Sequence, residues 1–267
     1  NTLAERIEKS TEVFCSGLFL SARWFAVSQL DRDGVQVIIM PDKESAEYCS
    51  VDLYNLTEGD KVFFLPDSGK SLERSNYKSS LGVQRTSAIG KLLEYKEGQL
   101  FIVTYPSALE EGIPAPSSIK DSLLKLNVGD EISHESIIES LFNSGFERVD
   151  FVAEPGQFAI RGAIVDIFSY SYNDPFRISF FGDEIDSINI FDCNTQLSKE
   201  KVVSAEIYPD LTSSDQEGEP CVQIADILPS ETLLWLDSSD MYKGRTFFPL
   251  LERFRKIYLE APLSRQN

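Results

Sequence analysis

The chain has 267 residues, of which 42% are hydrophobic and 25% are charged, a composition typical of a soluble globular protein with one large domain or two modest ones. Its 43 acidic residues outnumber the 25 basic ones, and the net charge of −18 argues against nonspecific attraction to a phosphate backbone and favours a basic protein partner. No apolar run reaches the roughly 18 residues that span a bilayer, and the first residues lack the basic end and cleavage site of a secretory signal, so we expect a cytoplasmic protein.

Cysteine and histidine usage restricts the possible chemistry. The four cysteines are far apart and form no CxxC pair, so they predict no zinc site: Cys15, Cys49, Cys193 and Cys221. We expect them to be buried free thiols in a reducing compartment. His134 is the only histidine, which makes histidine-based nucleophilic catalysis or a multi-histidine metal site very hard to build.

The first hundred residues alternate predicted helices with short apolar runs. Three continuous apolar runs are typical of strands buried on both faces: residues 35–40, 62–65 and 100–104. Helical spacing of apolar residues predicts helices over residues 1–30, after Pro41 and over residues 85–95. Strand, helix and strand in succession imply right-handed parallel crossovers, so this part predicts an α/β layer with a mainly parallel sheet.

A Pro/Gly/Ser-rich stretch at residues 110–118 (EEGIPAPSS) is typical of a crossing between domains. Residues 124–128 then alternate like a half-buried edge strand, and Ser133 is expected to cap a helix that ends near Asn143. Two β-hairpins are predicted next. The first joins residues 148–152 to 158–168 through a type II turn at Pro155 and Gly156, and the second joins residues 176–181 to 184–191.

After Lys199 the pattern loosens. Residues 202–208 and 232–236 (TLLWL) read as strands, residues 211–220 as a polar loop, and residues 247–258 carry apolar side chains at helical spacing. No obvious finishing element follows, so we expect this chain to be part of a longer one.

Two motifs suggest ligands but have simpler explanations. Residues 67–71 (DSGKS) follow a buried strand and end like a phosphate-binding loop, but the first glycine of GxxxxGK[ST] is replaced by Phe64, so an exposed turn is favoured. Asp183, Glu184 and Asp186 surround the turn of the second hairpin and could bind a hard cation. Glu184 and Asp186 share one face of the strand, whereas Asp183 faces away or into the turn, so a solvated hairpin end is the favoured interpretation.

Two arginines in the first predicted hairpin form a third candidate site. If Pro155 and Gly156 are the central turn residues, Arg148 lies opposite Ala163 and Asp150 opposite Arg161, so both arginines share one face and could meet carboxylates bidentately. The alternative is a weak surface ion pair between Arg161 and Asp150. The register leaves these two interpretations equally favoured.

The same residues carry a family resemblance. The R-x-D of Arg148 and Asp150, the G-x-F-x-x-R-G-x-x-x-D-I-F of residues 156–168 and the FFGDEIDSI of residues 180–188 together resemble the N-terminal module of the bacterial transcription-repair coupling factor (Mfd), which is similar to the repair protein UvrB. These matches span about fifty residues.

The resemblance implies a fold and a role. It implies a degenerate helicase-like α/β domain at residues 1–118, an inserted α+β domain at 119–200 and a return segment at 201–267 that completes the first domain. It also implies that the inserted domain binds UvrA, with Arg148, Asp150, Arg161 and Gly162 at the contact positions. RNA polymerase and DNA would be bound by parts of a longer parent protein that is an ATP-dependent translocase.

On this resemblance the segment is a noncatalytic module without cofactor or metal that recruits UvrA to stalled RNA polymerase in transcription-coupled nucleotide excision repair. UvrB itself carries a complete phosphate-binding loop and an aromatic hairpin, and this chain has neither. The alternative is a UvrB-type nucleotide-dependent repair enzyme with an atypical phosphate loop at residues 67–71.

Overall fold

The computed structural model describes residues 3–18, 21–30, 32–57, 59, 61–69, 76–172, 174–212, 221–238, 242 and 244–260. Contacts between residues separate the chain into two compact units. The first unit comprises Asn1–Gly69, Lys91–Ile113 and Val222–Asn267, and the second comprises Lys70–Gly90 and Pro114–Cys221. The domain boundaries expected at residues 118 and 200 stay a prediction. The contacts group residues 201–221 with the second unit.

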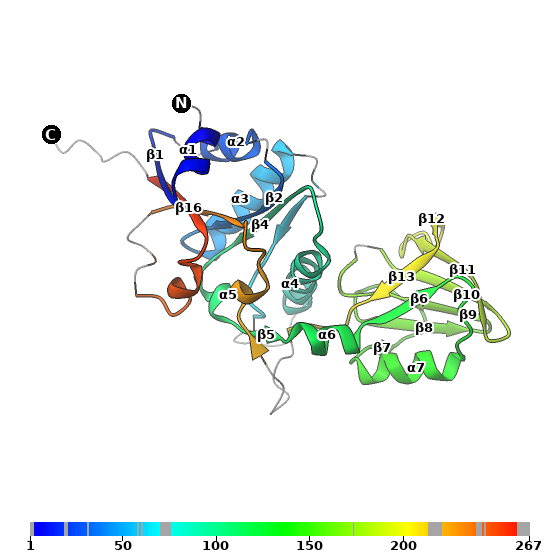
Figure 1. Ribbon diagram of the computed structural model, residues 1–267. Coiled ribbons are helices and arrows are strands. Elements are labelled where there is room, and N and C mark those ends of the chain that lie inside the picture. Colours follow the sequence, from blue (N-terminus) through cyan, green and yellow to red (C-terminus); the bar gives the residue numbers. More distant parts are fainter. Residues whose placement is uncertain are drawn as a thin grey trace. The chain divides into compact units, whose positions relative to one another are not determined.

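The first unit is built on a six-stranded parallel sheet with the strand order β1-β16-β15-β2-β4-β3 (Figure 1). Its strands are β1 (Glu12–Ser16), β2 (Gly34–Ile39), β3 (Val62–Phe64), β4 (Gln99–Thr104), β15 (Leu233–Leu236) and β16 (Arg255–Glu260). The three continuous apolar runs and the strand predicted at residues 232–236 all lie in this sheet, where β2, β4 and β15 are almost completely buried. This confirms the predicted α/β layer.

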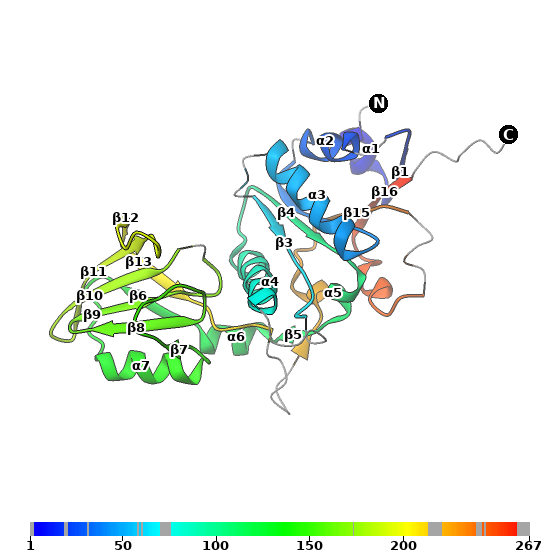
Figure 2. The ribbon, with the colours of Figure 1, turned by 180° about the vertical axis from the view of Figure 1, so that it is seen from behind.

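Short helices pack around this sheet (Figures 1 and 2). They are α1 (Leu3–Lys9), α2 (Ala22–Ser28), α3 (Lys43–Leu56), α5 (Pro106–Glu110), α8 (Ile224–Ile227) and the 3-10 helix η1 (Phe248–Leu251). Helix α3 begins after Asp42, whose carboxylate accepts a hydrogen bond of 2.8 Å from the Ser45 N–H, and it packs on β3 and β4. Its buried residues are Ala46, Cys49 and Leu53, whereas the apolar side chains of Tyr48, Val51 and Tyr54 are exposed.

Two predicted helices are wrong. Residues 1–30 contain the strand β1 between α1 and α2, and residues 247–258 form η1 followed by the start of β16. The two strands pair with each other in parallel, from Glu12 with Lys256 to Ser16 with Glu260. Backbone hydrogen bonds between the two ends of the chain thus replace the local bonds of a helix, and an apolar spacing read from one segment cannot report this.

The second unit is an α+β structure. Its helices are α4 (Asn76–Glu94, which continues into the first unit beyond Gly90), α6 (Pro116–Ser122) and α7 (His134–Asn143). Its main sheet has the order β12-β11-β10-β9-β8-β7. The strands are β7 (Glu147–Arg148), β8 (Gln157–Arg161), β9 (Ile164–Ile167), β10 (Phe176–Phe181), β11 (Glu184–Phe191) and β12 (Ser198–Val202).

Two further sheets have two strands each. In the first, β6 (Leu124–Asn127) pairs with β13 (Ser204–Ile207) in antiparallel fashion. In the second, β5 (Ile113–Pro114) pairs with β14 (Cys221–Val222). The predicted edge strand at residues 124–128 is therefore confirmed, and the partner strand comes from the segment predicted at 202–208.

Helix α7 covers one face of the main sheet (Figure 1). Ser133 caps it as predicted, since its hydroxyl accepts a hydrogen bond of 3.2 Å from the Ser136 N–H. Ile137 and Leu141 of this helix pack with apolar side chains of β8, β9, β10 and β11 in one core. At about 25 cal/mol per Å² of apolar area, this burial is the main stabilising contribution to the unit.

The second predicted hairpin is confirmed and the first is wrong. Strands β10 and β11 are joined by Gly182 and Asp183, with Phe181 opposite Glu184. In place of the first predicted hairpin, the structure has a hairpin later in the sequence. Its strands β8 and β9 are joined by Gly162 and Ala163, with Arg161 opposite Ile164. Strand β7 runs parallel to β8, so the turn at Pro155 and Gly156 does not join two antiparallel strands.

All four cysteines are free, but only Cys49 is buried and Cys221 is exposed, so the expectation of four buried thiols is wrong. Burial raises the pKa of the Cys49 thiol above its ordinary value. In the described ranges no helix is both long and apolar enough to cross a membrane.

Gly156 is required by both its backbone conformation and its neighbour. Its φ is +86°, and a Cβ at this position would overlap the hydroxyl of Tyr170. Gly129 offers a matched comparison in the same unit, because its φ is +89° and a Cβ there would meet nothing within 4 Å.

We therefore expect Gly156→Ala to destabilise the chain more than Gly129→Ala does. The positive φ costs about 1–2 kcal/mol in both variants, and the overlap with Tyr170 adds to it only in Gly156→Ala. Urea unfolding followed by circular dichroism measures the difference. Equal midpoints for the two variants would show that Tyr170 moves aside without cost.

Candidate functional site

Arg161 lies at the end of β8, on the face of the main sheet opposite α7. Side chains alternate along a strand, and Phe158 and Ile160 of β8 point into the α7 core, so Ala159 and Arg161 point the other way. The opposite face also receives Asp166 of β9, which pairs with Ala159 and with Arg177 of β10.

Asp166 is a buried carboxylate shared by two arginines. It is 1% exposed. Arg177 binds it with two donors, from Nε to Oδ1 at 2.8 Å and from Nη2 to Oδ2 at 2.9 Å, and Arg161 Nη2 donates to the same Oδ2. The hydrogen bonds with Asp166 raise the pKa of the Arg177 guanidinium above its ordinary value. A buried carboxylate needs such partners, because an unpaired one would lose its hydration without compensation.

Each arginine also lies over an aromatic ring. The Arg177 guanidinium is 4.1 Å from the centre of the Phe191 ring, and it donates two further hydrogen bonds to Gln196. The Arg161 guanidinium is 5.2 Å from the centre of the Phe151 ring. Phe151 is 64% exposed, so this second pair is open to solvent. Arg177 is thus embedded in the fold, whereas Arg161 stands at its surface.

Arg148 lies on the other face of the sheet, which corrects the predicted register. It pairs with Phe158 in the parallel β7–β8 ladder, and paired residues point to the same side, here the side of α7. The two arginines therefore do not share one face. They do share one edge, because β7 and β8 are the outermost strands of the sheet at that end.

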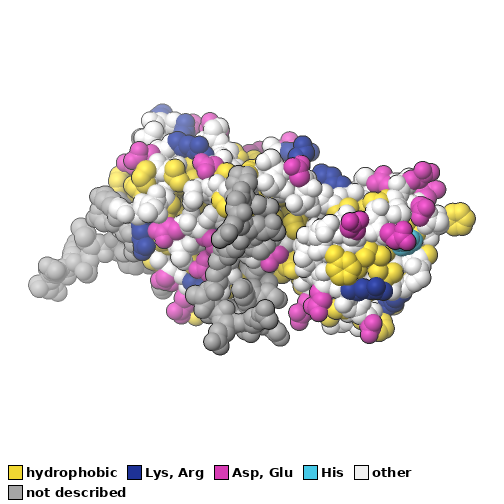
Figure 3. Space-filling view, turned by 90° about the horizontal axis from the view of Figure 1, so that it is seen from below, with side chains coloured by type: hydrophobic (Ala, Val, Ile, Leu, Met, Phe, Trp, Pro, Cys, Tyr) yellow, Lys and Arg dark blue, Asp and Glu magenta, His cyan; other side chains and the backbone are white. Residues whose placement is uncertain are grey.

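Arg148 is exposed, and its side chain has no hydrogen bond or ion pair within the part of the chain that the structure describes. A group of hydrophobic side chains with a basic side chain beside it lies over the region of α7 and β7 (Figure 3). Phe142 of α7, 52% exposed, contributes to the apolar surface of this region and packs edge-on against Phe158 at 5.2 Å between ring centres.

Asp150 is not the partner of Arg161, so the predicted surface ion pair is also wrong. Arg161 pairs with Ile164 in the ladder and with Asp166 through its guanidinium. Asp150 is exposed and makes no ion pair with a described residue. The partner that sequence reasoning missed, Asp166, could have been found as the single acidic residue in the apolar run of residues 164–168 (IVDIF), since a charge buried in a strand must be paired.

Gly162 occupies the turn next to Arg161. Its φ is +61°, whereas that of Ala163 is negative, as in a type II′ turn with glycine in its first central position. Both residues are exposed, and a Cβ on Gly162 would meet nothing within 4 Å. The turn therefore leaves the space beside Arg161 open to a partner.

The loop at residues 67–69 is occupied by the protein's own acceptors. Its N–H groups donate to the Tyr105 hydroxyl at 3.0 Å, to the Glu111 carboxylate at 2.7 Å and to the Asp67 carboxylate at 3.2 Å. A phosphate-binding loop needs these donors for its ligand. Lys70 and Ser71 of the same motif lie outside the described residues.

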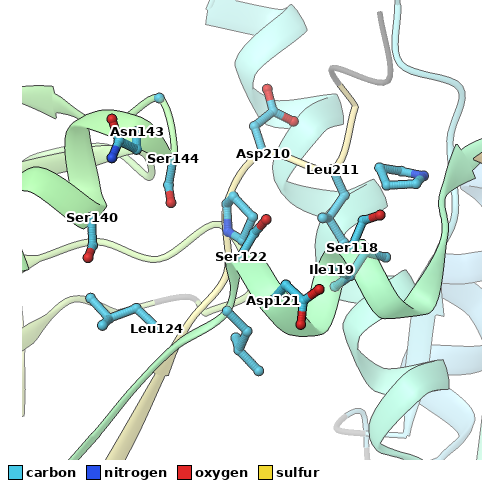
Figure 4. Close-up of a pocket in the computed structure, with 14 residues that line it drawn as sticks. Ser118, Ile119, Asp121, Ser122, Leu124, Ser140, Asn143, Ser144, Asp210 and Leu211 are labelled. Atoms are coloured by element: carbon cyan, nitrogen blue, oxygen red, sulfur yellow. The ribbon is translucent and has the colours of Figure 1, made fainter. Parts of the chain in front are cut away.

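The acidic turn and the cavity of the second unit contain none of the predicted contact residues. Asp183, Glu184 and Asp186 are exposed, and in the described ranges no three His, Cys, Asp or Glu side chains are placed to hold a metal ion. A cavity of about 470 Å³ lies in the second unit (Figure 4), and its polar lining from α6, the end of α7 and the segment after β13 includes Ser118, Asp121, Ser140, Asn143, Ser144 and Asp210. None of the four predicted contact residues lines it.

The different environments of the two arginines predict different effects on stability. Arg177→Ala removes the bidentate partner of a buried carboxylate and should cost about 3 kcal/mol. Arg161→Ala removes one donor from a side chain that is 35% exposed, and should cost less than about 1 kcal/mol. Equilibrium unfolding in urea checks the ranking, and a larger loss for Arg161→Ala would contradict it.

The comparisons with known proteins match this part of the chain. Residues 124–212 match the family model described as the UvrB interaction domain, and they include β8, β9 and the whole arginine site. The chain is also similar to proteins named transcription-repair-coupling factor. The one from Bacillus subtilis is 32% identical over 202 residues, which cover 74% of this chain and 17% of the relative.

Two further relatives of the same name agree. The protein from Haemophilus influenzae is 28% identical over 69% of this chain and 16% of its own length, and that from Escherichia coli is 28% identical over 66% of this chain and 15% of its own length. The chain therefore spans only about a sixth of the length of these relatives. The family match, the relatives and the fold agree that this chain contains a UvrB interaction domain at residues 124–212 and is a UvrB-like segment of the transcription-repair-coupling factor type.

Proposed function

We propose that this chain is a noncatalytic UvrB-like module of a transcription-repair coupling factor, and that its inserted domain, residues 119–200, binds UvrA. In the longer parent protein this contact recruits UvrA to stalled RNA polymerase in transcription-coupled nucleotide excision repair. The parent is an ATP-dependent DNA translocase whose contacts with polymerase and DNA lie in other parts. The boundaries 1–118 and 201–267 for the two halves of the α/β domain belong to the same proposal.

One observation carries the proposal. Within the residues that match the UvrB interaction domain, Arg161 is held at the sheet edge with a partly exposed guanidinium, an exposed Phe151 beneath it and an open turn at Gly162 beside it. Arg148 adds an exposed side chain at the same edge. Arginine binds carboxylates through paired donors in a fixed plane, so acidic side chains of UvrA fit this edge, although the net charge of −18 favours a basic partner for the chain as a whole.

The proposed lack of catalysis is supported by the loop at residues 67–69. Its three N–H groups donate to a tyrosine hydroxyl and two carboxylates, and the charges of Asp67 and Glu111 oppose a phosphate at the same place. A nucleotide would have to displace all three hydrogen bonds.

UvrA binding tests the proposal directly. We expect Arg148→Ala and Arg161→Ala each to weaken binding to UvrA from the same organism by about tenfold or more, because each removes a charged donor from the contact. Alanine is preferred to glutamate at Arg161, since a glutamate would stand beside Asp166 and confound binding with folding. Isothermal titration calorimetry at two salt concentrations gives the affinities and the expected weakening at high salt.

Lys125→Ala is the matched control. It removes one positive charge from the same unit, but its Nζ pairs with Glu206 at 2.5 Å in the β6–β13 sheet. We expect its affinity for UvrA to equal that of the unmodified chain. A loss as large as that of the arginine variants would attribute the effect to net charge, and unchanged binding in all three variants would overturn the proposed contact.

Nucleotide binding separates the module from the enzyme alternative. We expect titration of ATP with Mg²⁺ into the chain to give no heat of binding, because the loop donors are already satisfied. Binding in the micromolar range that disappears in Lys70→Ala would favour a UvrB-type nucleotide-dependent enzyme instead.

A further inference from the structure

The Asp166 site distributes its hydrogen bonds unequally between the two arginines. Arg177 satisfies both carboxylate oxygens, and its remaining donor contacts go to the carbonyl of Gln196 at 3.2 Å and its side-chain oxygen at 3.0 Å. Arg161 supplies a single donor, Nη2, to Oδ2. If Arg161 turned away, Asp166 would therefore still be paired in two places.

Arg161 has donors to spare. A guanidinium carries five N–H groups, and only one nitrogen of Arg161 is used in a hydrogen bond with a described residue. The side chain is 35% exposed and is bounded on one side by the buried carboxylate and on another by the Phe151 ring. Its Nε and Nη1 are therefore available to a carboxylate that approaches from solvent.

Such a long side chain normally loses rotamer freedom when it binds a partner. Here the carboxylate of Asp166 and the ring of Phe151 already restrict where the guanidinium can lie. These contacts restrict the guanidinium from the side that faces the fold. The donors on the side that faces solvent therefore stay available to a partner. Arg161 consequently loses less conformational entropy on binding than an unrestricted arginine would.

We propose that Asp166 and Phe151 are positioning residues that orient the Arg161 guanidinium for a carboxylate side chain of the docking partner, while Arg177 keeps Asp166 paired in the complex. This rests on the proposed function, and it specifies the chemistry of the contact: an aspartate or glutamate that meets Arg161, with an apolar neighbour over the exposed Phe151 ring. Neither positioning residue needs to touch the partner's carboxylate itself.

A double-mutant cycle on binding tests the proposal. The affinity for UvrA is measured for the unmodified chain, Asp166→Asn, Arg161→Ala and the double variant. We expect Asp166→Asn to weaken binding about five- to tenfold when Arg161 is present and less than about twofold when it is absent, because orientation has no value without the group oriented. A purely structural role would give the same loss in both backgrounds and would overturn the proposal.

Phe151→Ala repeats the cycle on a residue whose change leaves the core intact, since the ring is 64% exposed. It decides the matter if Asp166→Asn does not fold, as judged by circular dichroism. A loss that depends on Arg161 supports the positioning role, and an equal loss in both backgrounds contradicts it.

The outcomes also separate this inference from the function on which it rests. If the unmodified chain does not bind UvrA, the proposed function and the inference fall together. If it binds, and Arg161→Ala weakens binding but neither cycle shows coupling, the proposed function stands and the positioning role alone is wrong.

Discussion

In the second unit, a buried carboxylate determines how the side chains on the sheet face opposite α7 are paired. Asp166 is 1% exposed, and a charge with so little access to water persists only where its partners replace the lost hydration. Arg177 does so with two hydrogen bonds, and the backbone segment around Gln196 and the Phe191 ring hold Arg177 in turn. One buried acid thereby ties β9, β10 and the segment after β11 together. It leaves the second arginine at the surface with only part of its capacity used.

This arrangement explains the spacing of the motif at residues 156–168. Gly156 takes a positive φ where the chain turns under Tyr170, and Phe158 enters the α7 core. Arg161 and Gly162 place the guanidinium beside an open turn, and Asp166 follows on the same face as Arg161 because the two-residue turn pairs Arg161 with Ile164 and Ala159 with Asp166. The residues of the motif therefore act together: the turn and the strand register place the Arg161 guanidinium beside the Asp166 carboxylate.

Helices and strands that depend on neighbouring residues could be predicted from the sequence. Helix α7 was predicted from Ser133 and its apolar stripe, and the β10–β11 hairpin from its Gly182–Asp183 turn. The pairing of strands that are distant in the sequence, or that run in an unexpected direction, could not be predicted. Strand β1 finds its partner β16 at the other end of the chain, and β7 joins β8 in parallel, although the Pro155–Gly156 turn between them suggested a hairpin. Arg161 could be singled out from the sequence, but the face of Arg148 could not, because the parallel ladder pairs it with Phe158 and not with Ala163, and this difference in register moves its side chain to the other face.

In the first unit, which is built on a parallel sheet, the loop after β3 pairs its backbone N–H groups with acceptors of the same unit. Phosphate binding depends on backbone N–H groups that remain unpaired until the ligand arrives. In this chain Asp67 and Glu111 supply carboxylates to two of those groups, and Tyr105 supplies a hydroxyl to the third. The same physical requirement, that buried or converging polar groups be paired, thus applies to the loop after β3 and to the arginine site. In the first unit acidic side chains use up the donors, whereas in the second a buried acid leaves the donors of Arg161 facing solvent.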